Sequence, residues 1–260
     1  MSFERRALGR SGYALVSVSL ERAGFLAAFT ERTGGTSPEP FDSLNLSQAM
    51  GDDARLVAAN RRRVLDALGL RPFASAEQVH GAGVARVGRR RAGAGFRDAE
   101  SRIPKTDALV TSAVGLPLAI LTADCVPIAM ASPESGLLAV VHAGWRGLAA
   151  GILPKAARAF DDPADVRVAI GPAIGPCHYE VGEEVADAVG RASETGAVTE
   201  RRGGRVFLDL AGTTRRVLRS LGIRRVDVAD LCTACERRRF FSHRRDGPRT
   251  GRQALVAVRR

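Results

Sequence analysis

Residues 117–142 read PLAILTADCVPIAMASPESGLLAVVH, and they contain apolar runs at 117–125, 127–131 and 137–142 that are separated by short polar breaks. Apolar residues follow one another here without the alternation that marks a half-exposed strand, so we expect strands covered on both faces. Similar strand-like runs occur at 15–20, 24–30, 74–80, 84–87, 107–111, 166–170, 225–231 and 254–258. The sequence therefore predicts β-sheets enclosed between other layers.

Helical patterns are fewer than strand patterns. Asp52 and Asp53 can cap a helix that continues to about Leu68 and ends near Gly69. Further helices are expected over 147–160, 183–189 and 210–221. Strands and helices are mixed without a strict βαβ rhythm, an internal repeat or a clear linker. We therefore expect a single domain over residues 1–260.

Two polar residues interrupt the apolar stripe of the first predicted helix. Asn60 and Arg61 lie between Val57 and Val64, at the helical spacing of the apolar residues. Polar groups that point inward need hydrogen-bond partners, whereas a long basic side chain can also reach solvent. Bracing of the site loops and exposure to solvent are both open interpretations, and Arg61 is counted among the candidate substrate contacts.

Charge and composition argue against several partners. The chain carries a formal net charge of +11, but almost all of its basic residues are arginines, scattered along the chain and often beside acidic residues. We therefore expect no nucleic-acid partner. No apolar stretch reaches the roughly 20 residues that span a bilayer, and no signal peptide is apparent. With four cysteines, which suit a reducing compartment, we expect a cytoplasmic protein, monomeric or homodimeric, with no membrane partner.

His80, Cys125 and His142 are the strongest candidates for chemistry. Each lies at the end of an apolar run, in the local sequences QVHG, TADCVP and HAGWRG. Two imidazoles and a thiol are ligand types of a zinc site with one open position, where a water or a substrate is activated. Gly144 and Gly147, like Gly81, allow close backbone approach to a bound group. The three candidate ligands are far apart in the sequence, so spacing alone does not establish the site.

These blocks and several others make the chain resemble a known family. The matching blocks are FTERTGG (29–35), SLNL (43–46), QVHG (78–81), TADCVP (122–127), HAGWRG (142–147), IGPAIGPC (170–177) and FFSHRRDG (240–247). They are similar to those of the YfiH-type proteins, also labelled multicopper polyphenol oxidoreductase or laccase-domain proteins. The resemblance implies an α+β fold, a layered α/β/β/α sandwich with mixed β-sheets.

The same resemblance implies a zinc-dependent purine nucleoside enzyme with zinc ligands at His80, Cys125 and His142. The implied activities are phosphorolysis of adenosine, inosine or guanosine-type nucleosides and deamination of adenosine. Phosphate would attack C1′ while the purine leaves, and a metal-activated water would attack C6. By resemblance, Gly35 and Asn45 line the pocket.

Other candidate site residues are charged. Asp124, next to Cys125, is a candidate proton carrier, and its alternative role is to anchor a loop. Arg146, near the start of a predicted helix, could contact an anion. Arg244, Arg245 and Arg252 form a second candidate anion-binding segment. One of these two arginine sites is expected to hold phosphate.

The sequence also bears on three other functions. A conventional multicopper laccase needs on the order of ten histidines, and this chain has four, so copper is less expected than zinc. A cysteine hydrolase or transamidase, with a possible role in peptidoglycan precursor editing, would use Cys125 as nucleophile and His142 as base.

The last alternative is a closed structural zinc site. Its fourth ligand would be His178, His243, Cys177 or Cys232. Cys232 also forms a CxxC pair with Cys235, which we interpret as incidental because no thioredoxin-like unit or second half of a four-cysteine site accompanies it.

Overall fold

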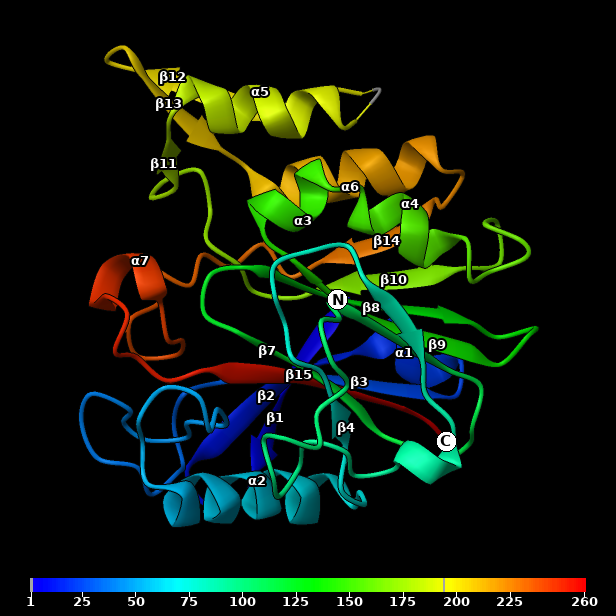
Figure 1. Ribbon diagram of the computed structural model, residues 1–260, viewed down its shortest axis with the longest axis vertical. Helices are drawn as coiled ribbons and strands as arrows, with labels where there is room; N and C mark the ends of the chain where they lie inside the picture. The colour runs from blue at the N-terminus through cyan, green and yellow to red at the C-terminus, as the bar shows by residue number, and fades with distance from the viewer. Residues whose placement is uncertain (1, 194) are drawn as a thin grey trace.

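Two mixed β-sheets lie face to face in the computed structural model, which describes residues 2–193 and 195–260 (Figure 1). The first sheet has the spatial order β1 (Phe3–Leu8), β2 (Gly12–Ser17), β3 (Phe25–Thr30), β15 (Gln253–Arg259), β7 (Leu118–Thr122) and β4 (Ala74–Ser75). The second has the order β14 (Arg225–Val228), β10 (Arg167–Ile170), β8 (Val126–Ser132), β9 (Leu137–Ala143), β6 (Ala108–Thr111) and β5 (Val84–Arg86).

Helices cover the outer faces of both sheets. Helix α2 (Ala54–Leu68) lies outside the first sheet, and α3 (Trp145–Ala149), α4 (Ile152–Ala157) and α6 (Leu210–Ser220) lie outside the second (Figure 1). This is the predicted α/β/β/α arrangement, so the α+β fold class is confirmed. The remaining elements are α1 (Val18–Arg22), a 3₁₀ turn (Arg89–Arg91), α5 (Glu183–Arg191), α7 (His243–Asp246), and the small sheet of β11 (Glu180–Val181), β13 (Arg205–Leu208) and β12 (Thr199–Arg202).

The central strands are apolar on both faces because each face packs against a different layer. In β8, Ile128 and Met130 belong to the core beneath the outer helices, whereas Ala129 and Ala131 belong to the core between the sheets. Successive side chains of a strand point to opposite faces. The continuous apolar run therefore belongs to a strand that is buried on both faces, as the sequence predicts.

Helix α2 begins and ends where its sequence predicts. The Asp53 carboxylate accepts a hydrogen bond from the backbone N–H of Arg55, and Gly69 adopts the left-handed conformation at φ +65°. Val64 and Leu65 pack with the first sheet in a third core. No helix in the described residues is long and apolar enough to cross a membrane.

Asn60 and Arg61 of α2 brace loops rather than reach solvent. The Arg61 guanidinium is buried and donates to the backbone carbonyls of Leu46, Gly95 and Phe96. Burial lowers the pKa of Arg61 to about 10. Asn60 donates to the backbone carbonyls of the 43–45 loop. Between the two open interpretations, the structure therefore selects bracing.

Several predicted elements end earlier than their apolar patterns suggest; the strand predicted over 15–20, for example, ends at Ser17, directly before α1. The sequence predicts a strand over 74–80, but β4 has only Ala74 and Ser75, and His80 has a left-handed φ of +57°. The predicted strand over 117–125 ends at Thr122, and Asp124 has φ +90°. The predicted helix over 147–160 is divided into α3 and α4 at Gly151, which has φ +76°. The departures at 74–80 and 117–125 place candidate ligands outside regular strands.

Candidate metal centre and substrate pocket

His80, Cys125 and His142 converge from three distant segments. Their potential ligand atoms all lie within 4.8 Å of one another. His142 lies in β9, Cys125 lies where the chain crosses from β7 to β8, and His80 lies in the loop after β4. The two imidazole rings meet edge to face, with centroids 4.9 Å apart and planes at 74°. The three segments therefore meet, as a shared metal site requires.

Asp107 organises this cluster, although the sequence analysis did not select it as a site residue. Its Oδ1 lies 2.8 Å from His142 Nδ1, and both side chains are buried. The same carboxylate accepts backbone N–H groups from His80 at 3.0 Å and from Gly81 at 2.8 Å. Bonding at Nδ1 leaves His142 Nε2 for another partner, which is the usual arrangement of a metal-binding histidine.

Asp107 also holds residues 79–81, at the end of the predicted strand, out of regular strand pairing. Backbone groups in this loop bond the carboxylate instead of a neighbouring strand. Burial opposes ionisation of Asp107, but His142 and the N–H groups of Gly81 and Val79 lower its pKa overall. The sequence contained one signal for this role, an aspartate at the start of an apolar strand. A buried carboxylate needs hydrogen-bond partners.

The Cys125 thiol is poised to ionise. Burial opposes ionisation, but His142 and His80 lower the pKa of Cys125 to about 6. His142 is also buried, which disfavours its charge, but Cys125 and Asp107 raise its pKa to about 9. Thiolate is the form of cysteine that binds metals and also the form that acts as a nucleophile.

The glycines beside the cluster make room for it. A Cβ atom on Gly144 would lie 2.9 Å from Cys125 Sγ and 3.3 Å from the Cδ2 atom of His80. A Cβ on Gly147 would lie 3.0 Å from the Gly81 carbonyl oxygen. A side chain at either position would therefore crowd the cluster or the loop that carries His80. The space and the sulfur–nitrogen donor set together fit a zinc-type ion with a further open position.

A pocket of about 510 Å³ opens onto the cluster. Its volume is within the range of small-molecule sites. Residues that the sequence analysis did not single out complete its wall: Gln78, Arg102, Trp145 and Tyr179. The Gln78 amide donates to Leu121 O at 2.8 Å and accepts from Leu121 N at 2.9 Å, so it ties the His80 loop to β7.

Several predicted substrate contacts line this pocket. Arg146, Arg244 and Arg252 do so, together with Asp124 and the three candidate ligands. None of these three arginines forms an ion pair with a described residue. Their positive charges therefore lack a carboxylate partner at hydrogen-bond distance in the described chain.

Asp124 lines the pocket but is engaged at both oxygens. Oδ1 accepts from Thr233 Oγ1 at 2.6 Å, and Oδ2 accepts from the backbone N–H of Arg244 at 2.6 Å. These bonds tie the crossover between the sheets to the C-terminal segment. They favour the loop-anchoring role over proton transfer.

Four predicted contacts lie outside the pocket lining: Gly35, Asn45, Arg61 and Arg245. Gly35 is packed against the backbone of the 43–44 segment, where a Cβ would lie 2.0 Å from Ser43 O. Asn45 Oδ1 accepts from the backbone N–H of Arg252 at 3.0 Å. Arg245 donates to the carbonyls of Thr233, Ala234 and Phe240. These residues support the loops behind the pocket.

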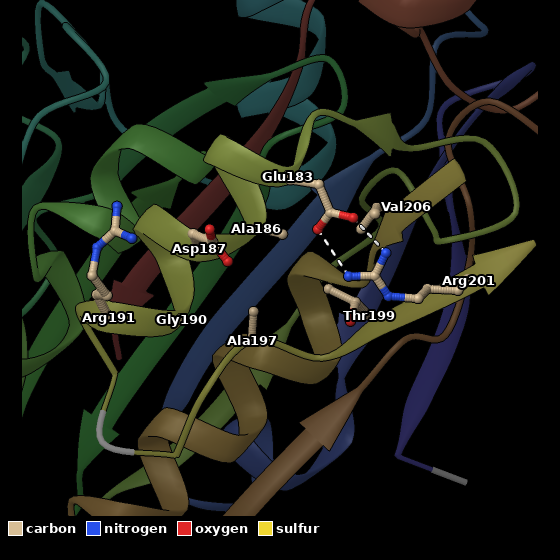
Figure 2. Close-up of a pocket in the computed structure, with 9 residues that line it drawn as sticks. All are labelled: Glu183, Ala186, Asp187, Gly190, Arg191, Ala197, Thr199, Arg201 and Val206. Carbon is tan, nitrogen blue, oxygen red and sulfur yellow. Dashed lines mark hydrogen bonds and ion pairs between the residues drawn. The ribbon is translucent and has the colours of Figure 1, made fainter. Parts of the chain in front are cut away.

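A different hollow, of about 350 Å³, lies between α5 and the β12–β13 hairpin. Figure 2 shows its lining, in which Glu183 and Arg201 are joined by two hydrogen bonds. It contains none of the candidate ligands and is lined by exposed charged residues. We therefore assign the chemistry to the pocket at the Cys/His cluster.

None of the candidates for a fourth ligand belongs to the cluster of His80, Cys125 and His142. Cys177, His178 and Cys232 form a separate group with Cys235, and His243 lines the pocket without joining the His80 cluster. Within the described chain, that cluster has only the three residues named above.

The match to a family model completes this assignment. A model described as multi-copper polyphenol oxidoreductase laccase matches residues 26–260. The chain belongs to this family. Purine nucleoside phosphorylase YlmD of Geobacillus stearothermophilus is 40% identical over 250 residues, which cover 92% of this chain and 91% of that protein. A purine nucleoside phosphorylase of Streptomyces coelicolor is 43% identical over 236 residues, 87% of this chain and 92% of the relative.

Solved structures of family members share the whole fold. The crystal structure of YlmD from Geobacillus stearothermophilus superposes with a TM-score of 0.92 at 37% identity, covering 100% of this chain and 99% of that one. Bacillus licheniformis hypothetical protein YfiH superposes with a TM-score of 0.90 at 32% identity, covering 99% of each chain. The resemblance to the YfiH-type family is thereby confirmed.

Proposed function

We propose that this protein is a zinc-dependent purine nucleoside phosphorylase that also deaminates adenosine. The observation that carries the proposal is one pocket containing a Cys/His centre and three arginines that have no carboxylate partner among residues 2–193 and 195–260. The centre suits a metal and the arginines suit phosphate. The relatives named purine nucleoside phosphorylases support the choice of substrates.

Zinc is preferred over a multicopper centre on the histidine count. One thiolate and two imidazoles can bind zinc, and the same donor set also occurs in single-copper sites. The family description mentions copper, but the four histidines of this chain are far fewer than the roughly ten of a multicopper oxidase.

The residues of the chain have separable tasks in this reaction. Arg146, Arg244 and Arg252 hold the phosphate, so that one of its oxygens forms the bond to C1′ as the bond from C1′ to the purine nitrogen breaks. The purine leaves with the bonding electrons and takes up a proton. Asp107 holds the His142 ring through Nδ1. When bound, the zinc ion supplies Lewis-acid polarisation of the substrate and of water. Asp124, predicted as a proton carrier, is proposed to position Arg244 through its backbone bond.

The direct test is turnover by purified, zinc-loaded protein. Adenosine, inosine and guanosine are incubated with and without phosphate, and bases, ribose 1-phosphate and inosine are separated by chromatography. Free base and ribose 1-phosphate should appear only with phosphate, whereas inosine should form from adenosine without it. Absence of turnover by fully metal-loaded protein would overturn the proposal.

Substitutions of single residues test whether the activity belongs to this pocket. Cys125→Ser should abolish turnover together with metal binding. Arg252→Ala should raise the KM for phosphate by about 10- to 100-fold, because one charge-assisted bond contributes about 1.5–3 kcal/mol. Arg201→Ala, in the hollow of Figure 2, is the matched control and should leave KM unchanged.

A second candidate function is a cysteine hydrolase or transamidase. It is favoured by the Asp107–His142 bond and the low pKa of Cys125, which resemble an oriented nucleophile–base pair. Metal analysis separates the two. Stoichiometric zinc with a thiol protected from alkylation supports the phosphorylase, whereas an active metal-free enzyme with rapid alkylation of Cys125 supports the hydrolase.

A further inference from the structure

A second cluster of metal-binding side chains lies outside the pocket lining. Cys177 and His178 come from the loop between β10 and β11, and Cys232 and Cys235 come from the segment after β14. The sulfur and nitrogen atoms of these four residues lie within 4.8 Å of one another. The CxxC pair that the sequence suggests is incidental is thus completed by a neighbouring Cys-His pair.

The spacing of these atoms matches the edges of a zinc tetrahedron. Zinc–sulfur and zinc–nitrogen bonds of about 2.3 and 2.0 Å imply edges of about 3.8 Å between sulfurs and about 3.5 Å between sulfur and nitrogen. His178 Nδ1 lies 3.4 Å from the sulfurs of Cys177 and Cys235 and 3.9 Å from that of Cys232. The sulfurs of Cys177 and Cys235 are 3.4 Å apart.

We propose that Cys177, His178, Cys232 and Cys235 bind a second zinc ion in a closed site with four protein ligands. Three thiolates and one imidazole are a standard structural zinc set. The proposal concerns a different ion from the one in the substrate pocket and does not depend on the reaction assigned above.

The backbone at Gly175 suits a cysteine in its thiolate form. The Gly175 N–H donates to Cys232 Sγ at 3.2 Å. A Cβ on Gly175 would lie 3.3 Å from Cys177 Sγ and 3.3 Å from the Cys232 Cβ, so glycine lets the loop pass close to both cysteines. Three sulfur atoms and one ring nitrogen lie within 4.8 Å of one another. A divalent cation suits such a group, because coordination deprotonates the thiols.

This site would join two segments that contact residues of the substrate pocket. Tyr179, which lines the pocket, follows His178 directly. Arg244 donates to the Glu180 carbonyl at 2.8 Å and stacks with its guanidinium carbon 4.8 Å from the Tyr179 ring centre. Thr233, inside the CxxC pair, donates to Asp124. A zinc ion here therefore positions pocket residues without touching the substrate.

Metal counting on the full chain tests the proposal. Wild-type protein purified under reducing conditions and reconstituted with zinc should contain two zinc ions per chain by mass spectrometry of the metal. Cys235→Ser and His178→Ala should each lose one zinc and keep the other. Cys125→Ser is the matched control, because it should lose the other zinc and keep this one. A zinc content that is the same in wild-type protein, Cys235→Ser and His178→Ala would overturn the proposal.

A spectroscopic measurement on wild-type protein covers the case in which a variant does not fold. Cobalt replacing zinc in a three-thiolate site should give strong sulfur-to-metal absorption. Cys177, Cys232 and Cys235 should be protected from alkylation until chelator is added. An intact mass two hydrogens lower, with a disulfide between Cys177 and Cys235 and no second metal, would refute the site. Two bound zinc ions without nucleoside turnover would reject only the proposed function.

Discussion

At the scale of single residues, the site depends on a carboxylate, that of Asp107, which does not line the pocket. Asp107 fixes both the ring of His142 and the backbone of the His80 loop. Two of the three candidate ligands therefore depend on one buried side chain. Such supporting groups commonly change metal affinity by about 10- to 100-fold.

Asp107→Asn tests this support. An amide keeps the size but cannot accept as strongly from His142 and from the backbone N–H groups together, so the Kd for zinc should rise about 10- to 100-fold. Competition with a chromophoric chelator measures the Kd. Asp209→Asn, at the start of α6, is the control and should leave it unchanged. Equal zinc affinity in both variants would contradict the role assigned to Asp107.

Gly144→Ala tests the space beside Cys125. The added methyl would lie 2.9 Å from the sulfur, so we expect at least a tenfold weaker zinc affinity in a protein that still folds. Gly88→Ala is the matched control, because its Cβ meets nothing within 4 Å. Circular dichroism checks folding, and zinc titration checks the site. Normal affinity in Gly144→Ala would show that the loop can move away.

At the scale of elements, buried charged side chains connect helices and strands to loops. Arg61 joins α2 to the 46 and 95–96 loops through backbone carbonyls. Glu31, after β3, joins β1 to the C-terminal segment through Arg5 and Arg239. These contacts explain why charged residues occur where a simple apolar stripe is expected, because each charge has several partners.

Removal of the Arg61 side chain should weaken this connection. Arg61→Ala leaves buried carbonyl oxygens without donors, so the free energy of unfolding should fall by about 3 kcal/mol or more. Urea unfolding followed by tryptophan fluorescence and circular dichroism measures the change. Arg62→Ala, exposed on the next position of the helix, should change stability by less than about 0.5 kcal/mol. Equal effects would contradict the bracing role.

Glu31 should make stability depend on pH on the acid side. Burial opposes its ionisation, but the bonds from Arg5 and Arg239 lower its pKa overall. The contribution to stability is therefore present above the unfolded pKa of about 4.3 and is lost as pH falls through the lower folded value. Glu31→Gln should flatten this part of the stability curve, measured by urea unfolding at several pH values. Exposed Glu100→Gln should not flatten it.

At the scale of the whole molecule, the pocket forms where loops from both sheets meet. Cys125 lies at the crossover between the sheets, His142 belongs to the second sheet, and Arg252 immediately precedes β15 of the first. Helix α7 lies beside the same ends of the sheets (Figure 1). The sheets provide rigid support, whereas the loops carry the chemistry.

Chelation of bound metals should loosen these loops without unfolding the sheets. Hydrogen exchange followed by mass spectrometry should increase in segments 175–181 and 231–236, because the proposed second zinc ion would no longer join them. Exchange in β8 and β9 should stay slow, since their backbone bonds lie in the core. A uniform increase over the chain would indicate global unfolding instead.

The sequence by itself indicated covered sheets and the candidate ligands, whereas the order of the layers was implied by the resemblance to the family. Local patterns report burial, so the continuous apolar runs predict sheets covered on both faces, and Asp53 and Gly69 delimit α2. The blocks around His80, Cys125 and His142 indicate a metal centre because their residue types suit one. They also carry the resemblance to the family, which comparison with known proteins shows.

Only the tertiary structure decided which distant segments meet. The bond from Asp107 to His142, the position of Asn45 behind the pocket and the grouping of Cys177 and His178 with the CxxC pair all join residues separated by tens to hundreds of positions. Local periodicity contains no information about such pairs, because they form when packed layers bring loops to the same edge. The sequence alone offered no reason to look beyond the CxxC pair, because the Cys and His that lie beside it belong to another loop.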